Sequence, residues 1–203
     1  ASNFVIDHNE INGGSNSIDW SIGIYCYISS NPEIINNDIN GGTTSAVNTE
    51  SFGIYCFDNS DPYISANTIN GGSCTQTVYG ILCNNNCDPD ISGNNITSGI
   101  NATYKYGIRC VDVSSPRIFN NTINAGNNYC SCIAIVLSSS PQIIQNTLLA
   151  SGGDYRRGIN EIDDTSNPAS VTNNIFNSSL TGGLSSYLYV DYFGGTLHFI
   201  TNI

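Results

Sequence analysis

Aromatic residues recur in a strand-like motif and are the first candidates for recognition chemistry. The motif reads Gly-Ile-Tyr-Cys in its first two copies, each followed directly by a second aromatic residue. Period-two alternation places both aromatic residues on the face opposite the isoleucine and the cysteine, so they point outward. Such rings pack against sugars or partner surfaces, although stacked rings can also do no more than stabilise a sheet. We expect a face that binds a glycan or a protein, formed by Tyr25, Tyr27, Tyr55 and Phe57.

Catalysis would need charged groups along the same face. A polysaccharide lyase needs a base and a neutralising cation, and a glycosidase needs two carboxylates about 5–10 Å apart. The outward positions of the aligned motifs carry a single charge, Arg109. We therefore assign no catalytic residue and favour a non-catalytic domain, with a polysaccharide lyase, hydrolase or epimerase as the alternative. A hidden active site would be sought in the mixed-charge segment of Asp154, Arg156, Arg157, Glu161, Asp163 and Asp164.

Acidic residues gather near the prolines of the repeat described below. They are Asp58, Asp61, Asp88, Asp90 and Asp112. Calcium takes oxygen ligands from such residues, but aspartate is also common in exposed turns because of its local hydrogen bonds. We assign no metal site or cofactor and keep calcium as a secondary alternative. With two histidines and no Cys-x-x-Cys pair, a zinc or haem site has little support.

Cysteines fall into two groups of four. Cys26, Cys56, Cys83 and Cys110 occupy equivalent inward positions of successive motifs. In-register stacking keeps their β-carbons about 4.8 Å apart, which exceeds the roughly 3.5–4.5 Å of a disulfide, so we expect free thiols in the core. The pairing of the other four, which lie in or beside turns, stays open: Cys74, Cys87, Cys130 and Cys132.

A repeat of 25 to 30 residues positions all these side chains. Its copies align on Pro32, Pro62, Pro89, Pro116, Pro141 and Pro168, and residues 4–14 form a further copy without proline. Apolar residues lie two and seven positions after the proline. Between them, at the fifth position, every copy has an asparagine: Asn9, Asn37, Asn67, Asn94, Asn121, Asn146 and Asn173.

Each repeat holds about three short strands and no helical periodicity, so it can bury its apolar residues only by stacking on the next repeat. We predict an all-β fold, a right-handed single-stranded parallel β-helix of about seven coils and roughly 34 Å in length. The asparagines should take left-handed backbone angles in a turn and hydrogen-bond from coil to coil as a ladder. A β-sandwich of antiparallel hairpins is the competing fold.

The Gly-Ile-Tyr-x strand and the Ser/Asn-x-Pro-x-Ile-x-x-Asn-x-Ile unit resemble the parallel β-helix repeats of the pectate-lyase-like superfamily. The closest resemblance is to its NosD-like, non-catalytic repeat arrays, and it covers residues 4 to about 177. It implies a secreted or cell-surface structural protein that serves as a rigid scaffold or in adhesion and carbohydrate binding. In the enzymes of the superfamily, the substrate groove runs along the Gly-Ile-Tyr strand. The same coil serves many activities, so the motif specifies fold more strongly than function.

We expect one β-helix domain over residues 1–203, with regular coils over about 4–177 and an irregular C-terminal coil or cap over 178–203. No amphipathic helix precedes Phe4 or follows Ile175, and the strand edges of a parallel stack invite further pairing. The chain is therefore expected either to be a fragment of a longer array or to self-associate end to end.

Charge and hydropathy exclude two kinds of partner. The chain has 5 Lys and Arg against 16 Asp and Glu, a net charge of −11, so a nucleic-acid partner is excluded. It has no run of about 18 apolar residues, so insertion into a membrane is not expected. Loops between coils carry further recognition-type residues, among them Trp20, Tyr104, Tyr129 and Tyr155. Ranks of Thr and Asn on the third strand leave an ice-binding protein as another alternative.

Overall fold

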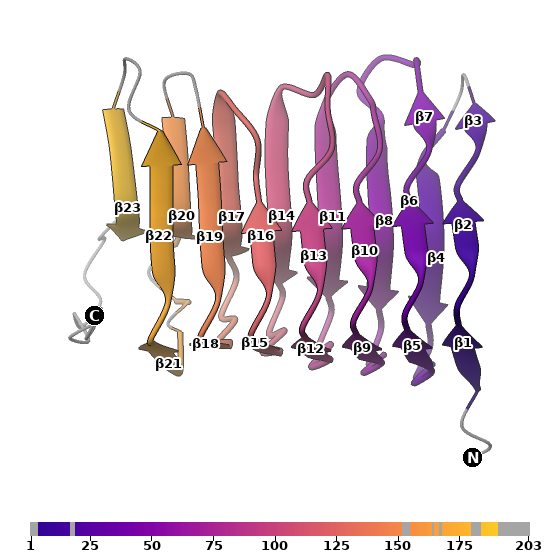
Figure 1. The fold of residues 1–203 in the computed structure, drawn as a ribbon, viewed down its shortest axis with the longest axis horizontal. Coiled ribbons are helices and arrows are strands. Elements are labelled where there is room, and N and C mark those ends of the chain that lie inside the picture. The colour runs from indigo at the N-terminus through magenta and orange to yellow at the C-terminus, as the bar shows by residue number, and fades with distance from the viewer. Residues whose placement is uncertain are drawn as a thin grey trace.

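The protein is built from strands and turns throughout the part of the chain that its structure describes. This structure, a computed structural model, describes residues 4–16, 19–151, 155–163, 165–166, 168–179 and 184–190. Figure 1 shows strands from successive repeats lying side by side along one axis. All the strand pairs are parallel and join each strand to its equivalent in the next repeat, which confirms the predicted parallel β-helix. A sandwich of antiparallel hairpins is excluded.

Three sheets of seven strands form the walls of the β-helix. The first sheet comprises β1 (Val5–Asp7), β5 (Glu33–Ile35), β9 (Tyr63–Ser65), β12 (Asp90–Ser92), β15 (Arg117–Phe119), β18 (Gln142–Ile144) and β21 (Ser170–Thr172). The second comprises β2 (Glu10–Asn12), β6 (Asp38–Asn40), β10 (Thr68–Asn70), β13 (Asn95–Thr97), β16 (Thr122–Asn124), β19 (Thr147–Ser151) and β22 (Ile175–Ser179). The third comprises β4 (Ser21–Tyr27), β8 (Glu50–Phe57), β11 (Thr77–Asn84), β14 (Tyr104–Val111), β17 (Tyr129–Ile135), β20 (Tyr155–Glu161) and β23 (Leu184–Val190).

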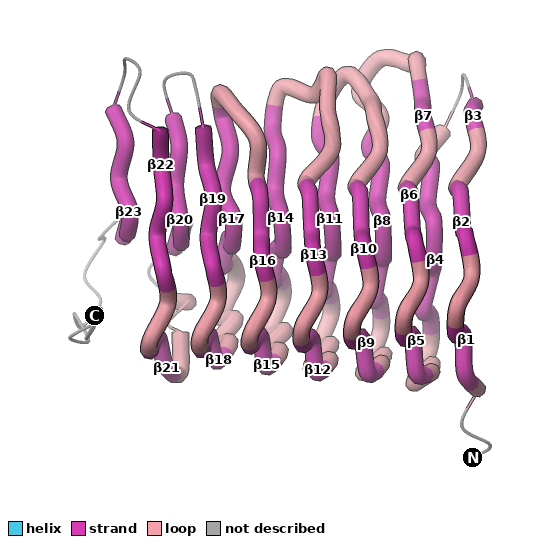
Figure 2. The backbone as a smooth tube through the Cα atoms, in the orientation of Figure 1, coloured by secondary structure: helices cyan, strands magenta, loops and turns pink. Residues whose placement is uncertain are grey.

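The variable loops join the second sheet to the third along one edge of the rod, at the top of Figure 2. A small two-stranded sheet at this edge pairs β3 (Ser15–Asn16) with β7 (Thr43–Thr44). Residues 191–203, the last part of the predicted C-terminal cap, lie outside the described residues, whereas β23 continues the third sheet beside β20. In the described ranges, no helix is long and apolar enough to cross a membrane.

One isoleucine column from each sheet fills the core. On the third sheet, for example, Ile54 pairs directly with Ile81 and Ile81 with Ile108, and all three are fully buried. Burial of a side chain of this size is worth about 1.5–3 kcal/mol. Because every coil adds equivalent side chains at one strand spacing, the core is continuous along the rod.

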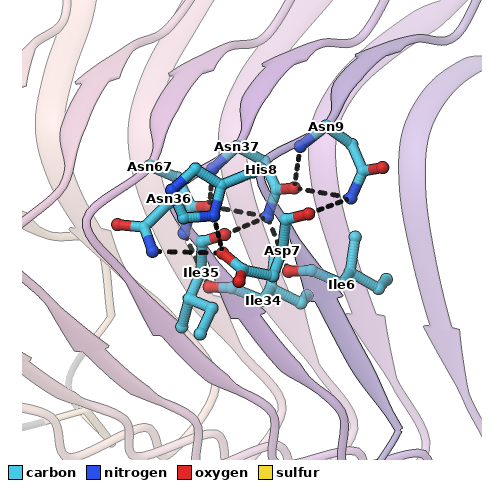
Figure 3. A network of polar contacts seen from close by, with 9 residues as sticks. All are labelled: Ile6, Asp7, His8, Asn9, Ile34, Ile35, Asn36, Asn37 and Asn67. Carbon is cyan, nitrogen blue, oxygen red and sulfur yellow. Dashed lines mark hydrogen bonds and ion pairs between the residues drawn. The ribbon is translucent and has the colours of Figure 1, made fainter.

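The asparagine ladder is present (Figure 3), and its rungs from Asn37 to Asn174 are buried. The backbone N–H and the Nδ2 of Asn37 both donate to Oδ1 of Asn67, at 2.8 and 3.0 Å. Nδ2 of Asn37 also donates to the carbonyls of Ile6 and Ile35, both at 2.8 Å. The predicted coil-to-coil bonding is therefore confirmed, and its effect is to satisfy backbone groups that face the interior.

Two details of the predicted ladder are wrong. The left-handed residue is the one before each ladder asparagine, as at Asn36 with φ 55° and Ala66 with φ 56°. The last rung is Asn174 and not Asn173, since Oδ1 of Asn174 accepts the backbone N–H of Asn146 at 2.8 Å. One extra residue after Pro168 shifts this coil, so that Asn173 takes the left-handed position with φ 54°.

All eight cysteines are buried free thiols, as predicted for the four stacked ones. The four stacked cysteines occupy the same register position on neighbouring strands β4, β8, β11 and β14: Cys26, Cys56, Cys83 and Cys110. Cys87, whose pairing was open, takes the place of a serine in a turn. Its Sγ accepts the N–H of Ser60 at 3.3 Å, and its own N–H donates to Oγ of Ser114 at 3.0 Å.

Candidate functional site

The outer face of the third sheet, called here the aromatic face, carries a series of adjacent rings across several coils. The four predicted residues lie together: the ring centroids are 5.1 Å apart for Tyr25 and Tyr55 and 5.8 Å for Tyr27 and Phe57. Tyr25 and Tyr27 are about half exposed, but Tyr55 is only 7% exposed. The accessible part of the predicted site is therefore its tyrosine pair on β4.

Trp20 covers the rest of the predicted site. Its ring meets Phe52 and Tyr55 edge to face, with centroids 5.7 and 6.4 Å away. The loop is held by Asn16, whose Nδ2 donates to the carbonyl of Trp20 at 2.7 Å. An indole that is 48% exposed thus replaces Tyr55 as the outer aromatic surface here.

A second line of rings comes from the residue before the glycine of the motif. Strict period-two alternation would place this residue inward, whereas it faces outward. A β-carbon on Gly53 would lie 2.6 Å from the carbonyl of Gly80 and from Cγ2 of Ile69, so this position faces the core, next to the inward Ile54. Two consecutive inward positions interrupt the alternation, so the preceding residue faces outward. An aromatic residue before the glycine was the available sequence signal, present at Phe52, Tyr79 and Tyr106.

The first cavity on the aromatic face, called the Trp20 hollow, has a volume of about 230 Å³. Rings of Trp20, Phe52 and Tyr55 line it, and Glu50 and Arg109 add charges. Neither Glu50 nor Phe52 was singled out from the sequence. The combination of apolar walls with a few polar groups is typical of small-ligand sites.

A fixed chain of hydrogen bonds crosses this hollow. The hydroxyl of Tyr79 donates to Oε1 of Glu50 at 2.8 Å and accepts a bond from Nη1 of Arg109 at 3.3 Å. The guanidinium of Arg109 also lies over the ring of Tyr106, 4.9 Å from its centroid. Burial, followed by the charge of Glu50, raises the pKa of Tyr79, so its hydroxyl is protonated at neutral pH and can donate to the carboxylate.

A second cavity, called the Arg157 hollow, has a volume of about 140 Å³. Tyr104, Tyr106 and Tyr129 form its aromatic side, and Arg157 and Asn160 line the other side. The rings of Tyr129 and Tyr155 stack at 4.5 Å. Recognition-type residues of the loops and strand starts therefore meet the same face as the Gly-Ile-Tyr motif.

The predicted acidic residues serve as turn acceptors. The backbone N–H of Asp88 donates to Oδ1 of Asp61 at 2.6 Å, and that of Ser115 donates to Oδ1 of Asp88 at 2.5 Å. Asp90 forms an ion pair with Arg117 at 3.3 Å. Among the described residues, no group of three or more His, Cys, Asp or Glu could hold a metal ion. Calcium stays an untested prediction.

The mixed-charge segment is brought together only in part, and its members Asp154 and Asp164 lie outside the described residues. Arg156 is buried, while Glu161 pairs with the inward Ile135. Burial opposes ionisation of Asp163, but hydrogen bonds from Leu137, Thr165 and Ser166 lower its pKa overall. Asp163 therefore acts as a turn cap in this structure.

On the second sheet, the column of Thr side chains faces solvent, whereas the column of Asn side chains bonds to the backbone. Oδ1 of Asn40 accepts the N–H of Gly42 at 2.7 Å, and Asn70 does the same for Gly72 at 2.8 Å. These Asn side chains therefore stabilise the turn that follows each strand. Ice binding stays a prediction that these contacts do not test.

A family model described as a right handed beta helix region matches residues 1–123. The match covers the strands that carry the Trp20 hollow. No curated protein and no solved structure matches the chain.

Proposed function

Because the chain belongs to the right-handed β-helix family, whose scaffold serves many activities, we propose that it is a rigid, non-catalytic domain that binds a glycan on its aromatic face. The observation that carries the proposal is the Trp20 hollow, where aromatic walls surround a fixed pair of opposite charges. Sugars have apolar ring faces and hydroxyl edges, which match these two kinds of surface.

The stiffness of the face supports binding. Rings on neighbouring strands stack at 4.9 to 5.8 Å, a spacing that follows from the strand separation and repeats along the sheet. The parallel sheet and the asparagine ladder hold these rings in place before any ligand arrives. Binding to a preformed surface loses little conformational entropy.

A protein partner, a secreted or cell-surface location, and a role as scaffold or adhesin remain parts of this proposal that await tests. End-to-end self-association stays a prediction as well. It would pair the edge strands β1, β2 and β4, each of which has one strand partner among the described residues.

The experiment is a screen of oligosaccharides for both binding and product formation, with Trp20→Ala as the test variant. We expect affinity for a bound glycan to fall by about tenfold or more, because an aromatic anchor wall is lost. Tyr63→Ala is the matched control, since Tyr63 is an exposed aromatic residue on the first sheet. Absence of any glycan ligand, or equal losses in both variants, would refute the proposed site. Turnover of a glycan would refute the non-catalytic role.

A further inference from the structure

Four thiols form a column on the inner face of the third sheet, called here the cysteine column. Its members occupy one register position on four neighbouring strands: Cys26, Cys56, Cys83 and Cys110. Cys26 is 2% exposed, and the other three are fully buried. The aromatic face lies on the outer side of the same strands, so the proposed glycan binding makes no use of these thiols.

The sulfur atoms of the cysteine column face one another. The thiols of Cys26 and Cys56 are within hydrogen-bonding reach, and so are those of Cys56 and Cys83. In-register strands keep equivalent atoms about 4.8 Å apart. A disulfide needs β-carbons about 3.5–4.5 Å apart, so closing one would draw neighbouring coils together. The column is therefore spaced for a bridge that is longer than a sulfur–sulfur bond.

A metal ion between two thiolates provides a bridge of that length. A metal–thiolate bond is about 2.3 Å long, so an ion held in line between two thiolates joins sulfurs about 4.6 Å apart. This length is close to the strand separation of about 4.8 Å, and the backbone need not move. Thiolates are also the ligands that soft metal ions prefer.

The packing at this register position accepts more volume than a thiol fills. In the next coil the register partner of Cys110 is Ile135, which is fully buried and has a larger side chain than cysteine. The same place in the core is therefore able to enclose additional atoms beside the sheet.

The column selects ions by charge and by coordination geometry. Two thiolates and one divalent ion form a neutral unit, whereas a monovalent ion such as Cu(I) leaves a negative charge in an apolar interior. Zinc takes four ligands in a tetrahedron, and a column offers thiols along one line only. Over the described ranges, no group of three or more His, Cys, Asp or Glu could hold a metal ion, so a site here has two ligands.

We propose that the cysteine column binds soft divalent metal ions of the mercuric class, which take two thiolates in line. One ion lies between Cys26 and Cys56, and a second lies between Cys83 and Cys110. For each ion, two S–H bonds break, two metal–sulfur bonds form, and two protons pass to solvent without transfer of electrons. The site is independent of the proposed glycan binding.

The thiols are protonated before an ion arrives. Burial, followed by the charge of Asp88, raises the pKa of Cys110, so a thiolate is rare there at neutral pH. Metal binding must therefore release protons, two for each ion. A weakly buffered titration with mercuric chloride should show this ratio.

Close contacts between thiols outside the column are removed before the test. Cys87 interacts with Cys56 and Cys83. Cys130 interacts with Cys132. The background variant therefore carries Cys87→Ser, which restores the residue of the neighbouring coils in that turn, and Cys132→Ala. This variant keeps all four thiols of the column and should retain two mercuric ions per chain.

Two further variants of this background keep two column thiols each and differ in whether these are neighbours. Cys26→Ala with Cys56→Ala leaves the neighbours Cys83 and Cys110 and should retain one ion. Cys56→Ala with Cys110→Ala leaves Cys26 and Cys83 about 9.6 Å apart, two strand spacings, and should retain none.

The measurement counts mercuric ions per chain by mass spectrometry under anaerobic conditions. Reduced, folded protein is equilibrated with mercuric chloride, since local opening admits ions to the core, and is then washed with glutathione. Two thiols fixed at the bridge length resist this competitor as a chelate, whereas a single thiol loses its ion. Zinc chloride is the control salt, and zinc should not be retained.

Equal retention of mercury by the two double-alanine variants, or no retention by the background variant, would overturn the proposal. If circular dichroism shows that a double-alanine variant is unfolded, X-ray absorption by the mercury-loaded background variant provides the test. Two sulfur ligands at about 2.3 Å are expected, and three or four sulfurs would refute the two-thiolate site.

Discussion

Replacing one central rung of the asparagine ladder should destabilise the whole rod. Asn94 is 2% exposed, and its side chain takes part in five hydrogen bonds. Its Oδ1 accepts the backbone N–H and Nδ2 of Asn67, at 2.9 and 3.0 Å. Its Nδ2 donates to the carbonyls of Ile64 and Ser92 and to Oδ1 of Asn121. Asn94→Ala removes all five bonds and inserts no replacement.

The size of the effect follows from what remains unpaired. The backbone N–H of Asn67, left buried without its acceptor, costs about 1–3 kcal/mol, and each of the other four lost bonds contributes about 1 kcal/mol. We therefore expect Asn94→Ala to lower the free energy of unfolding by about 5–7 kcal/mol. Urea denaturation followed by circular dichroism and by fluorescence measures this change, and agreement of the two signals tests for a single transition.

Two other asparagines, one in an exposed turn and one at the first rung of the ladder, serve as controls for this substitution. Asn12→Ala removes one exposed bond, from the N–H of Gly14 to Oδ1 at 2.9 Å, and should cost about 1 kcal/mol or less. Asn9→Ala, at the first rung, removes two bonds donated by Nδ2 and should give an intermediate loss. If Asn94→Ala were no more destabilising than Asn12→Ala, the ladder would not be a principal source of stability.

The remaining predictions concern the inward-facing glycine of the motif and the buried thiols. Gly53→Ala should destabilise the protein by about 1–3 kcal/mol in thermal melts, because the new β-carbon would overlap the carbonyl of Gly80. A melting temperature unchanged in Gly53→Ala would contradict this reason. Burial raises the pKa of Cys132 from 9.0 to about 12, so its contribution to stability is full below pH 9 and is lost as pH rises from 9 to 12. Urea titrations should show a decline of about 1.4 kcal/mol per pH unit for each such thiol, and a flat profile above pH 9 would exclude it.

The repeat length and the isoleucine spacing were sufficient to predict the sheets and the core. Position alone identified six of the seven ladder rungs, because stacking in register requires equivalent residues at equivalent places. The seventh failed at Asn173 because a single inserted residue after Pro168 is compensated by a left-handed residue, and sequence periodicity does not reveal which residue absorbs the shift.

The aromatic face was predicted only in part for a different reason. Alternation placed Tyr25 and Tyr55 outward, but the prediction continued it through Gly53, whose position faces the core, and so missed the outward Phe52. The position of Trp20 depends on a loop that is held by a local hydrogen bond from Asn16 and by the tertiary contact of its ring with Phe52. Cavities formed by residues from different coils could not be read from one repeat.

Each coil adds one strand to the third sheet. The number of repeats between the two hollows therefore sets the distance between them. Duplicating one internal repeat between β11 and β17 would move the two hollows apart by one strand separation without altering either of them. Deleting the repeat of β14 would instead remove lining residues of both hollows, Arg109 and Val111 from one and Tyr104 and Tyr106 from the other. Repeat number, a property that changes readily by duplication within a gene, would then select the chain length of the ligand.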